Sequence, residues 1–476
     1  MKKTGLFKII MIMTLVMVFF TWLFSASYFS ETKLTELGLY NVGFFDYFSI
    51  IFSSLEFDYF IQIFLLLLGV GAFYGVLNKT GKYRAWVERI ANKYKGNEFI
   101  FLVVIAFIIA ALTAVFDYGY NMLIFIPFII SIILAMGYDK VTAMLTTFGA
   151  MLVGTIGSIL GYNTTKIIAD LLSLKMENAF YFKIALFILS FIVLMIFLSN
   201  AKKTKELNTE EEKELFLGEK YSSKYSITPI IVTFAVVAFL LVLGCTSWSG
   251  TFGVEFFNNI HEKLLNFSPK LPYFHITSEG IDKGFENIAI FGKILGDAPA
   301  LGNWYYAEMT IVLVIASMIL GKIYKLETVE AMVDGVKKIL KPAGMVLLCY
   351  IVVYLAGNQM FFPTIASWLL KLSSKLSIVM GSIVMIIGSV LHVDILYASN
   401  YVVPQIAHSV SNKELVLLLG QGIYGVTMFV APTSALLVFG LTYLGVPYKE
   451  WLKKTWKLVL ALLAVVLVVL IIVKVI

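Results

Sequence analysis

The residues best placed to do chemistry are two aspartates inside apolar sequence. Asp117 opens the stretch DYGYNMLIFIP at 117–127, and Asp394 opens DILYASNYVVP at 394–404. In both stretches a tyrosine follows three positions after the aspartate and a proline follows ten positions after it. An ionisable side chain inside hydrocarbon costs at least about 2.5 to 3.5 kcal/mol. Two such costs at matching positions, 277 residues apart, indicate a duplicated functional site.

Each aspartate could bind a coupling ion, accept a proton or hold an amine of a solute. The alternative is that each caps a helix at a wet tip near the membrane surface. We favour a functional role, since intramembrane carboxylates are rare and usually mark substrate or ion pathways. His392, two residues before Asp394, could be a proton partner or a hydrogen-bonded structural histidine.

The elements that must position these residues are membrane-spanning helices. Of the 476 residues, 60% are hydrophobic and only 14% are charged, and the mean hydropathy is +0.89. That is more apolar surface than a soluble core could bury. The formal net charge of +7 does not indicate a nucleic-acid partner, because Lys and Arg gather in short loops between apolar segments. We therefore expect an all-α, multi-pass protein of the cytoplasmic membrane, with the lipid bilayer as a partner.

The apolar runs and the charged segments between them divide the chain into five parts. We expect an N-terminal span and external segment at 1–57, a first repeat at 58–200, a cytoplasmic linker at 201–225, a second repeat at 226–457 and a C-terminal span at 458–476. The first repeat contains a hairpin at 99–136 and a broken helix at 141–165. The second contains an external loop at 247–305, a hairpin at 376–412 and a broken helix at 415–445.

The spacing of the repeated motifs predicts that the two repeats are inverted. The basic segment 75–93 resembles 321–339 at an offset of 246, whereas the hairpin tips are 277 apart. The additional residues include 345–355, which are apolar enough to form the core of one extra span. One extra span makes the two tips enter from opposite sides, which is the signature of an inverted-topology repeat. This reading gives nine spans and two hairpins, with the N-terminus inside and the C-terminus outside.

Two helices are interrupted by residues that form helix poorly. GTIGSILGYNTT at 154–165 is rich in glycine and hydroxyl residues, and Pro432 removes a backbone donor within FVAPTSALL at 429–437. Unwound backbone is tolerated in a membrane only where it lines a cavity. Thr155, Ser158, Thr433 and Ser434 could offer oxygens to sodium, or these small residues could serve helix packing. The candidate substrate or ion site comprises Asp117, Tyr120, Asn121, Thr155, Gly157, Ser158, Asn163, Asp394, Tyr397, Ser399, Asn400, Pro432, Thr433 and Ser434.

Three features carry a resemblance to a known family. They are GYDKVTAMLTTFGAMLVGTIGS at 137–158, APTSALLVFGLTYLGVPYKEWLKKTWK at 431–457, and the order of helix, hairpin and broken helix in each half. The chain resembles the ion transporter superfamily of secondary carriers, and most of all its anaerobic C4-dicarboxylate carrier (DcuC/YfcC-like) branch.

The resemblance implies an elevator-type carrier with a scaffold domain able to form a homodimer. Members carry dicarboxylates, short-chain acids, aminobenzoyl-glutamate or basic amino acids, usually coupled to sodium, protons or an exchanged solute. This chain departs from its relatives by placing aspartates at the tips, where two carboxylates would repel a dicarboxylate unless protonated or paired with a cation.

These observations predict a secondary active transporter. Its solute would be small and carboxylate-bearing, a dicarboxylate or an amino acid, moved by cation-coupled symport or exchange. A basic amino-acid or amine antiporter using the paired aspartates is the alternative, and a non-transporting scaffold or receptor belongs to another class. An enzyme is not expected, because no nucleophile lies at a useful spacing from a base or metal ligands. No cofactor is expected beyond a coupling Na+ or H+.

Overall fold

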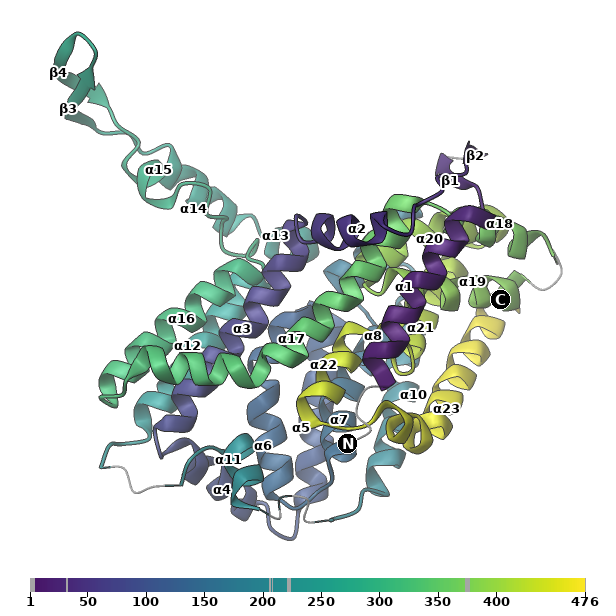
Figure 1. The fold of residues 1–476 in the computed structure, drawn as a ribbon, viewed down its shortest axis with the longest axis horizontal. Coiled ribbons are helices and arrows are strands. Elements are labelled where there is room, and N and C mark those ends of the chain that lie inside the picture. The colour runs from purple at the N-terminus through teal and green to yellow at the C-terminus, as the bar shows by residue number, and fades with distance from the viewer. Residues whose placement is uncertain are drawn as a thin grey trace.

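The protein is a bundle of long apolar helices. The computed structural model describes residues 5–30, 33–204, 207, 209–220, 224–372 and 377–475 (Figure 1). Within these residues, eight helices are long and apolar enough to cross a membrane. They are α1 (Gly5–Leu23), α3 (Asp58–Lys79), α5 (Glu98–Phe116), α10 (Phe180–Ser199), α12 (Thr228–Cys245), α16 (Tyr306–Ile323), α17 (Thr328–Gln359) and α23 (Tyr448–Val475). The expectation of a helical, multi-pass membrane protein is confirmed.

Two groups of shorter helices complete the bundle. The first follows α5 and consists of a 3-10 helix (Gly119–Ile124), α6 (Ile126–Ala135), α7 (Lys140–Met144), a π-helical turn (Leu145–Gly149), α8 (Ala150–Ile156), a second π-helical turn (Tyr162–Lys166) and α9 (Ile167–Leu171). The second consists of α18 (Phe362–Lys371), α19 (Ser377–His392), α20 (Ile395–Ser409), α21 (Lys413–Met428) and α22 (Ala435–Leu444). The first residue of the expected hairpin at 376–412 lies outside the described residues.

The remaining elements lie at the two ends of the bundle. They are β1 (Ala26–Ser30), β2 (Lys33–Gly38), α2 (Asp46–Ser54), α4 (Tyr83–Lys93), α11 (Glu210–Leu217), α13 (Trp248–Phe252), α14 (Phe256–Leu265), β3 (Lys270–Thr277), β4 (Gly280–Asn287) and α15 (Ile290–Leu295). Both strand pairs are antiparallel, so the fold is mostly helical and not all-α as expected from the sequence. Elements α14, α15, β3 and β4 form an arm that projects from the body, and they occupy much of the expected loop at 247–305 (Figure 1).

Helix α17 differs from the sequence-based expectation of two separate elements. One continuous helix of 32 residues contains most of the segment 321–339, which resembles the basic segment 75–93. The same helix also contains the expected extra span at 345–355. Pro342 lies inside it, and Figure 1 shows the helix changing direction along its length. A proline removes one backbone hydrogen bond and bends a helix without having to end it. The interfacial and spanning parts are therefore joined at a bend and not by a loop.

The crossing of α17 with α3 depends on glycines that bring the two backbones together. A Cβ atom on Gly335 would lie 2.0 Å from the carbonyl oxygen of Gly71, and one on Gly75 would lie 2.2 Å from the carbonyl oxygen of Ala331. Only glycine permits this approach, which is a common way for membrane helices to pack closely.

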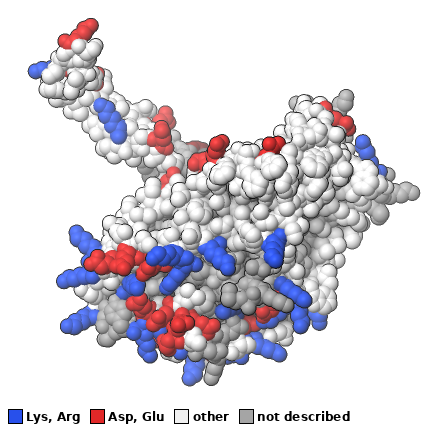
Figure 2. Space-filling view, in the orientation of Figure 1, with Lys and Arg blue, Asp and Glu red and all other residues white. Residues whose placement is uncertain are grey.

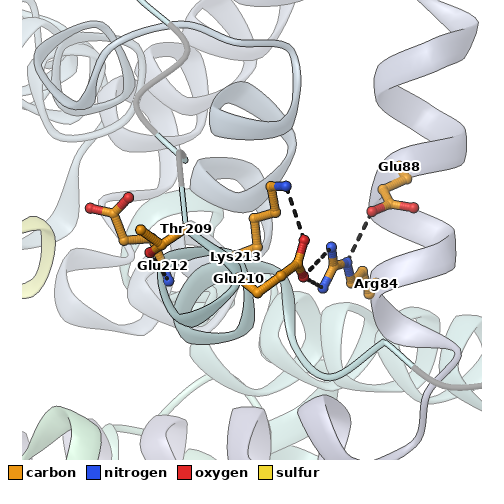
Figure 3. A network of polar contacts seen from close by, with 6 residues as sticks. All are labelled: Arg84, Glu88, Thr209, Glu210, Glu212 and Lys213. Atoms are coloured by element: carbon orange, nitrogen blue, oxygen red, sulfur yellow. Dashed lines mark hydrogen bonds and ion pairs between the residues drawn. The ribbon is translucent and has the colours of Figure 1, made fainter.

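Lys and Arg side chains gather at one end of the bundle, where α4 and α11 lie (Figure 2). Figure 3 shows a network at this end: the buried Arg84 guanidinium lies 3.0 Å from Glu88 and 3.2 Å from Glu210, and Lys213 lies 3.0 Å from Glu210. The Lys213 and Arg84 contacts hold the pKa of the Glu210 carboxyl below its usual range. Thr209 caps α11 by accepting a hydrogen bond from the backbone N–H of Glu212.

Helix α11 belongs to the segment expected to be a solvated linker, and it is docked on the bundle. The Ser131 hydroxyl of α6 donates to the Phe216 carbonyl at 2.5 Å, and Phe216 and Leu217 are buried. Glu219 pairs with Lys79 at the end of α3, at 2.7 Å. Residues 205, 206, 208 and 221–223 of the expected linker lie outside the described residues.

Candidate functional site

The two aspartates, far apart in the sequence, line one central cavity of about 70 Å³. This is room for a few water molecules. Asp117 is 8% exposed and Asp394 is 7% exposed. Because the cavity lies among helices, its polar groups are shielded from bulk water, which strengthens any interaction with a charged solute.

Asp117 is positioned by the end of α5. It adopts a left-handed backbone conformation with φ of +53°, which aspartate tolerates better than most residues. Its carboxylate accepts a hydrogen bond from the Thr164 hydroxyl at 2.8 Å. The side-chain amide of Asn163 donates to the Asp117 carbonyl at 3.4 Å. The segment after α8 therefore holds the turn at Asp117, which is the tip of the hairpin expected from the sequence.

Asp394 caps α20 and faces the cavity at the same time. One carboxylate oxygen accepts from the backbone N–H of Leu396 at 3.0 Å. The other accepts from the hydroxyls of Tyr59 at 3.1 Å and Tyr350 at 3.0 Å, and the Tyr350 hydroxyl lies 2.9 Å from that of Tyr120. Hydrogen bonds to an ionised acceptor are the strong ones, so the tyrosines can stabilise a charged carboxylate. Asp394 therefore caps a helix, as the alternative from the sequence has it, and also lines the cavity.

The turn before Asp394 is strained. Val393 has a φ of +53°, a conformation that is an outlier for a β-branched residue and costs about 1 to 3 kcal/mol. Its carbonyl accepts a hydrogen bond from the Tyr424 hydroxyl at 2.8 Å. The turns at Asp117 and Val393 thus each contain a left-handed residue that neighbouring segments hold in place.

The interrupted helices also reach the cavity. Helix α8 ends at Ile156, and α21 ends at Met428 before α22 begins at Ala435. Ser434, Ala435 and Leu436 line the cavity, so the first turn of α22 borders it. The first N–H groups of a helix have no partner within the helix and carry a partial positive charge, which favours a bound anion. The cavity therefore offers two carboxylates and one helix N-terminus.

The predicted site residues separate into two groups. Those that line the central cavity are Asp117, Tyr120, Thr155, Asn163, Asp394 and Ser434. Those that do not line it are Asn121, Gly157, Ser158, Tyr397, Ser399, Asn400, Pro432 and Thr433. Of the four residues considered for sodium, only Thr155 and Ser434 reach the cavity.

Several residues of the second group have contacts elsewhere. The Thr433 hydroxyl donates to the Val390 carbonyl at 2.6 Å, and the Ser158 hydroxyl lies 2.9 Å from that of Thr165. Gly157 packs against the backbone of Phe187, 2.3 Å from where a Cβ would lie. The Asn400 side chain bonds the Leu396 carbonyl on its own helix. These residues stabilise the tips and breaks without facing the cavity.

The His392 ring does not reach Asp394. It stacks on Tyr401 with ring centres 4.8 Å apart and meets Phe362 edge-on. Neither ring nitrogen has a hydrogen-bond partner among the described residues. The proton-partner role considered from the sequence therefore has no hydrogen bond among the described residues to support it.

Sequence reasoning named Tyr120 but missed five other tyrosines of the site. Tyr59, Tyr305, Tyr306 and Tyr424 line the cavity, and Tyr350 bonds Asp394. They come from α3, α16, α17, α21 and the residue before α16, so they are widely separated in the sequence. No short sequence motif links these tyrosines. The one signal in the sequence is the large number of tyrosines, 25 in the chain.

Sequence reasoning also missed Lys183. This lysine is fully buried within α10, where its amine donates to the carbonyl of Ile159 at 3.0 Å and to that of Met176. The Ile159 N–H in turn donates to the Ala114 carbonyl at 2.8 Å, near the end of α5. Lys183 therefore holds the segment after α8 against the helix that ends at Asp117.

A second cavity of about 130 Å³ adjoins the first. Four residues line both cavities: Asp117, Asn163, Tyr305 and Tyr306. The second is also lined by Asn121 and by residues near α13 and the start of α16, on the side of the projecting arm. Tyr305 and Tyr306 therefore stand between the central cavity and a space nearer that end of the bundle.

Carboxylates and interrupted helices around a buried cavity in a multi-pass helical protein are the arrangement that many membrane carriers use for their solute site. The family comparison makes the class specific. This chain belongs to the C4-dicarboxylate anaerobic carrier (DcuC) family, whose model matches residues 4–475. The family predicted from the sequence is confirmed.

Individual relatives are distant. A protein of Escherichia coli (strain K12) named "Putative basic amino acid antiporter YfcC" is 21% identical over 164 residues, which are 34% of this chain and 32% of that protein. An uncharacterized protein from Haemophilus influenzae is 28% identical over 97 residues, 20% of this chain and 19% of that protein. The matches thus span about a third and a fifth of these relatives.

One solved structure resembles the whole chain weakly. The YdaH transporter of Alcanivorax borkumensis, described as having an unusual topology, has 10% identity and a TM-score of 0.43, with 98% of each chain covered. At this level of similarity no detail of that structure transfers to this chain.

Proposed function

We propose that this protein is a secondary active transporter for an amino acid, with a basic amino acid as the preferred solute. The observation that carries the proposal is the pair of carboxylates in one cavity. Among the described residues that line it, none is Lys, Arg or His. A site with two carboxylates and no side-chain cation favours a solute that brings positive charge.

The cavity also has a group that could bind the carboxylate of an amino acid. The first turn of α22 borders the cavity, and its unpaired N–H groups suit a carboxylate. An amino acid is larger than the few waters that fit a cavity of about 70 Å³, so it would occupy this cavity together with the adjoining one of about 130 Å³, with its carboxylate at α22 and its amines at Asp117 and Asp394. The printed name of the Escherichia coli relative points in the same direction.

A second candidate is a dicarboxylate, which the description of the family favours. In that case protons or sodium ions would neutralise the aspartates, and the solute would bind with its coupling cations. In the first candidate the amines of the solute neutralise the aspartates, and in the second the coupling protons or sodium ions do. The two candidates therefore predict different solutes and a different dependence of transport on ion gradients.

We also propose two inverted repeats and an elevator-type movement of the hairpins and interrupted helices. Support for the inversion comes from the two different offsets of the repeated motifs, 246 and 277 residues, and support for one shared site comes from the two aspartates in one cavity. The Lys/Arg-rich end would be cytoplasmic by the positive-inside rule. Helices α1 and α23 both begin near that end and run away from it (Figures 1 and 2), which would place the N-terminus inside and the C-terminus outside.

Uptake into proteoliposomes tests the function. Radiolabelled lysine, arginine, succinate, fumarate and a short-chain acid would be compared with and without a sodium gradient, a proton gradient and internal unlabelled solute. We expect uptake or exchange of the basic amino acids and little of the dicarboxylates. Sodium-dependent uptake of dicarboxylates alone would favour the second candidate. Absence of transport of every solute by monodisperse, reconstituted protein would overturn both.

A further inference from the structure

A cavity at the Lys/Arg-rich end of the bundle lies apart from the solute site. It has a volume of about 230 Å³ and is formed by the start of α1, the bend of α17 and the turn between α22 and α23. Its lining is mostly apolar and includes Leu6, Met345, Leu441 and Val446, together with two lysines, Lys341 and Lys449. None of the described residues that line it is Asp or Glu.

The side chains of these two lysines have no polar partner in the described part of the chain. Neither Lys341 nor Lys449 has an ion pair or a side-chain hydrogen bond with any described residue, and both are exposed. Glu450, the nearest acidic residue in sequence to Lys449, pairs with Lys454 at 3.1 Å. Two unpaired ammonium groups on the rim of one cavity attract an anion.

The surroundings specify what kind of anion fits. The cavity lies at the end of the spanning helices α1 and α23, where lipid headgroups would be. Phe7 and Ile12 of α1 are 47% and 58% exposed, so an apolar surface leads from the cavity along α1 towards the hydrocarbon. A free phosphate would use the lysines alone, whereas a phospholipid would use the lysines and the apolar lining.

We propose that this cavity binds the headgroup of an anionic phospholipid, with Lys341 and Lys449 contacting the phosphate and the acyl chains lying along α1. The cavity joins elements that are distant in sequence. Leu441, near the end of α22, lines it, and Leu436, near the start of the same helix, lines the central cavity. The lipid would therefore hold one end of a helix whose other end borders the solute site. Binding itself does not depend on the identity of the solute.

Lipid binding to the full-length protein in detergent tests the proposal. Native mass spectrometry would measure the tightest dissociation constant for dioleoylphosphatidylglycerol and for dioleoylphosphatidylcholine. We expect a preference for the anionic lipid in the wild type. The double variant Lys341→Gln, Lys449→Gln should bind it about 30-fold more weakly, since each lysine near an anionic headgroup contributes about fivefold to the affinity.

Two control proteins separate this site from general surface charge and from misfolding. The variant Lys322→Gln, Lys453→Gln makes the same charge change at lysines that do not line the cavity, and it should bind like the wild type. The variant Lys341→Arg, Lys449→Arg keeps the charges and should retain the preference. An equal loss in the Lys322/Lys453 variant, or an unchanged preference in the Lys341/Lys449 glutamine variant, would overturn the proposal. Displacement of the lipid by millimolar inorganic phosphate would instead identify a simple phosphate site and would also overturn it.

Discussion

Replacing both cavity aspartates with asparagine should remove solute binding while leaving the fold nearly intact. Asparagine caps helices as well as aspartate does, so the bond between residue 394 and the Leu396 N–H can persist. The hydroxyls of Tyr59 and Tyr350 now donate to Asp394, and each can rotate to accept from an amide instead. We therefore expect Asp117→Asn, Asp394→Asn to lose no more than about 2 kcal/mol of stability.

The expected loss of affinity follows from the bonds that a charged amine would make. A hydrogen bond to a charged group contributes about 1.5 to 3 kcal/mol, which corresponds to roughly a 10- to 150-fold change in dissociation constant. Each single variant should weaken binding of a basic amino acid within that range. If both carboxylates contact the same ammonium group, the double variant should lose less than the sum of the two single losses.

The assay combines binding in detergent with exchange in proteoliposomes. Binding of lysine would be followed by calorimetry, and KM and kcat by counterflow. Asp58→Asn is the matched control, because Asp58 is exposed on the first turn of α3 and bonds Gln62. A double variant that binds and exchanges the solute within twofold of the wild type would refute the role of the aspartate pair.

Three further predictions concern the residues that support the site. Lys183→Met should lower kcat about tenfold or more at similar expression, because the Ile159 and Met176 carbonyls lose their donor; unchanged kinetics would show that Lys183 does not position the segment after α8. Gly335→Ala should destabilise the α3–α17 crossing by about 1 to 3 kcal/mol or more, measured as a lower melting temperature, whereas Gly344→Ala on the same helix, with open space around its Cα, should not. Glu210→Gln should increase tryptic cleavage within α11 at neutral pH more than Glu211→Gln does. Since the pKa of Glu210 is lowered in the fold, its contribution is present at neutral pH and is lost as pH falls through that lowered pKa, so cleavage within α11 by pepsin, which is active in acid, should be equal in the two variants.

The sequence predicted those parts of the fold that depend on local composition. Runs of apolar residues identified the spanning helices because a helix in lipid must be apolar along its whole length. Residues 345–355 were recognised as a span for this reason, but their continuity with the preceding basic segment was not. A proline in a helix can end it or bend it, and the choice at Pro342 depends on the packing of α17 against its neighbours.

The sequence predicted the two aspartates of the candidate site, but it did not predict which neighbouring residues line the cavity with them. Asp117 and Asp394 stood out because a carboxylate in an apolar run is costly, and both line the central cavity. Thr433 and Ser158 had the same oxygen chemistry as Thr155 and Ser434, yet only the latter two line the cavity. Which face of an unwound segment points inward depends on contacts such as the bond from Thr433 to the Val390 carbonyl, which no local pattern encodes.

The sequence by itself determined that this is a multi-pass membrane protein, that it has two matching acidic motifs and that it belongs to this carrier family. Those conclusions rest on the cost of burying charge and on patterns within short stretches of chain. Only the tertiary structure decided that the two aspartates share one cavity, that tyrosines from separate helices bond one of them, and that Lys183 holds the segment beside the other. Such contacts join residues that are far apart in the chain, so they are set by how the helices pack.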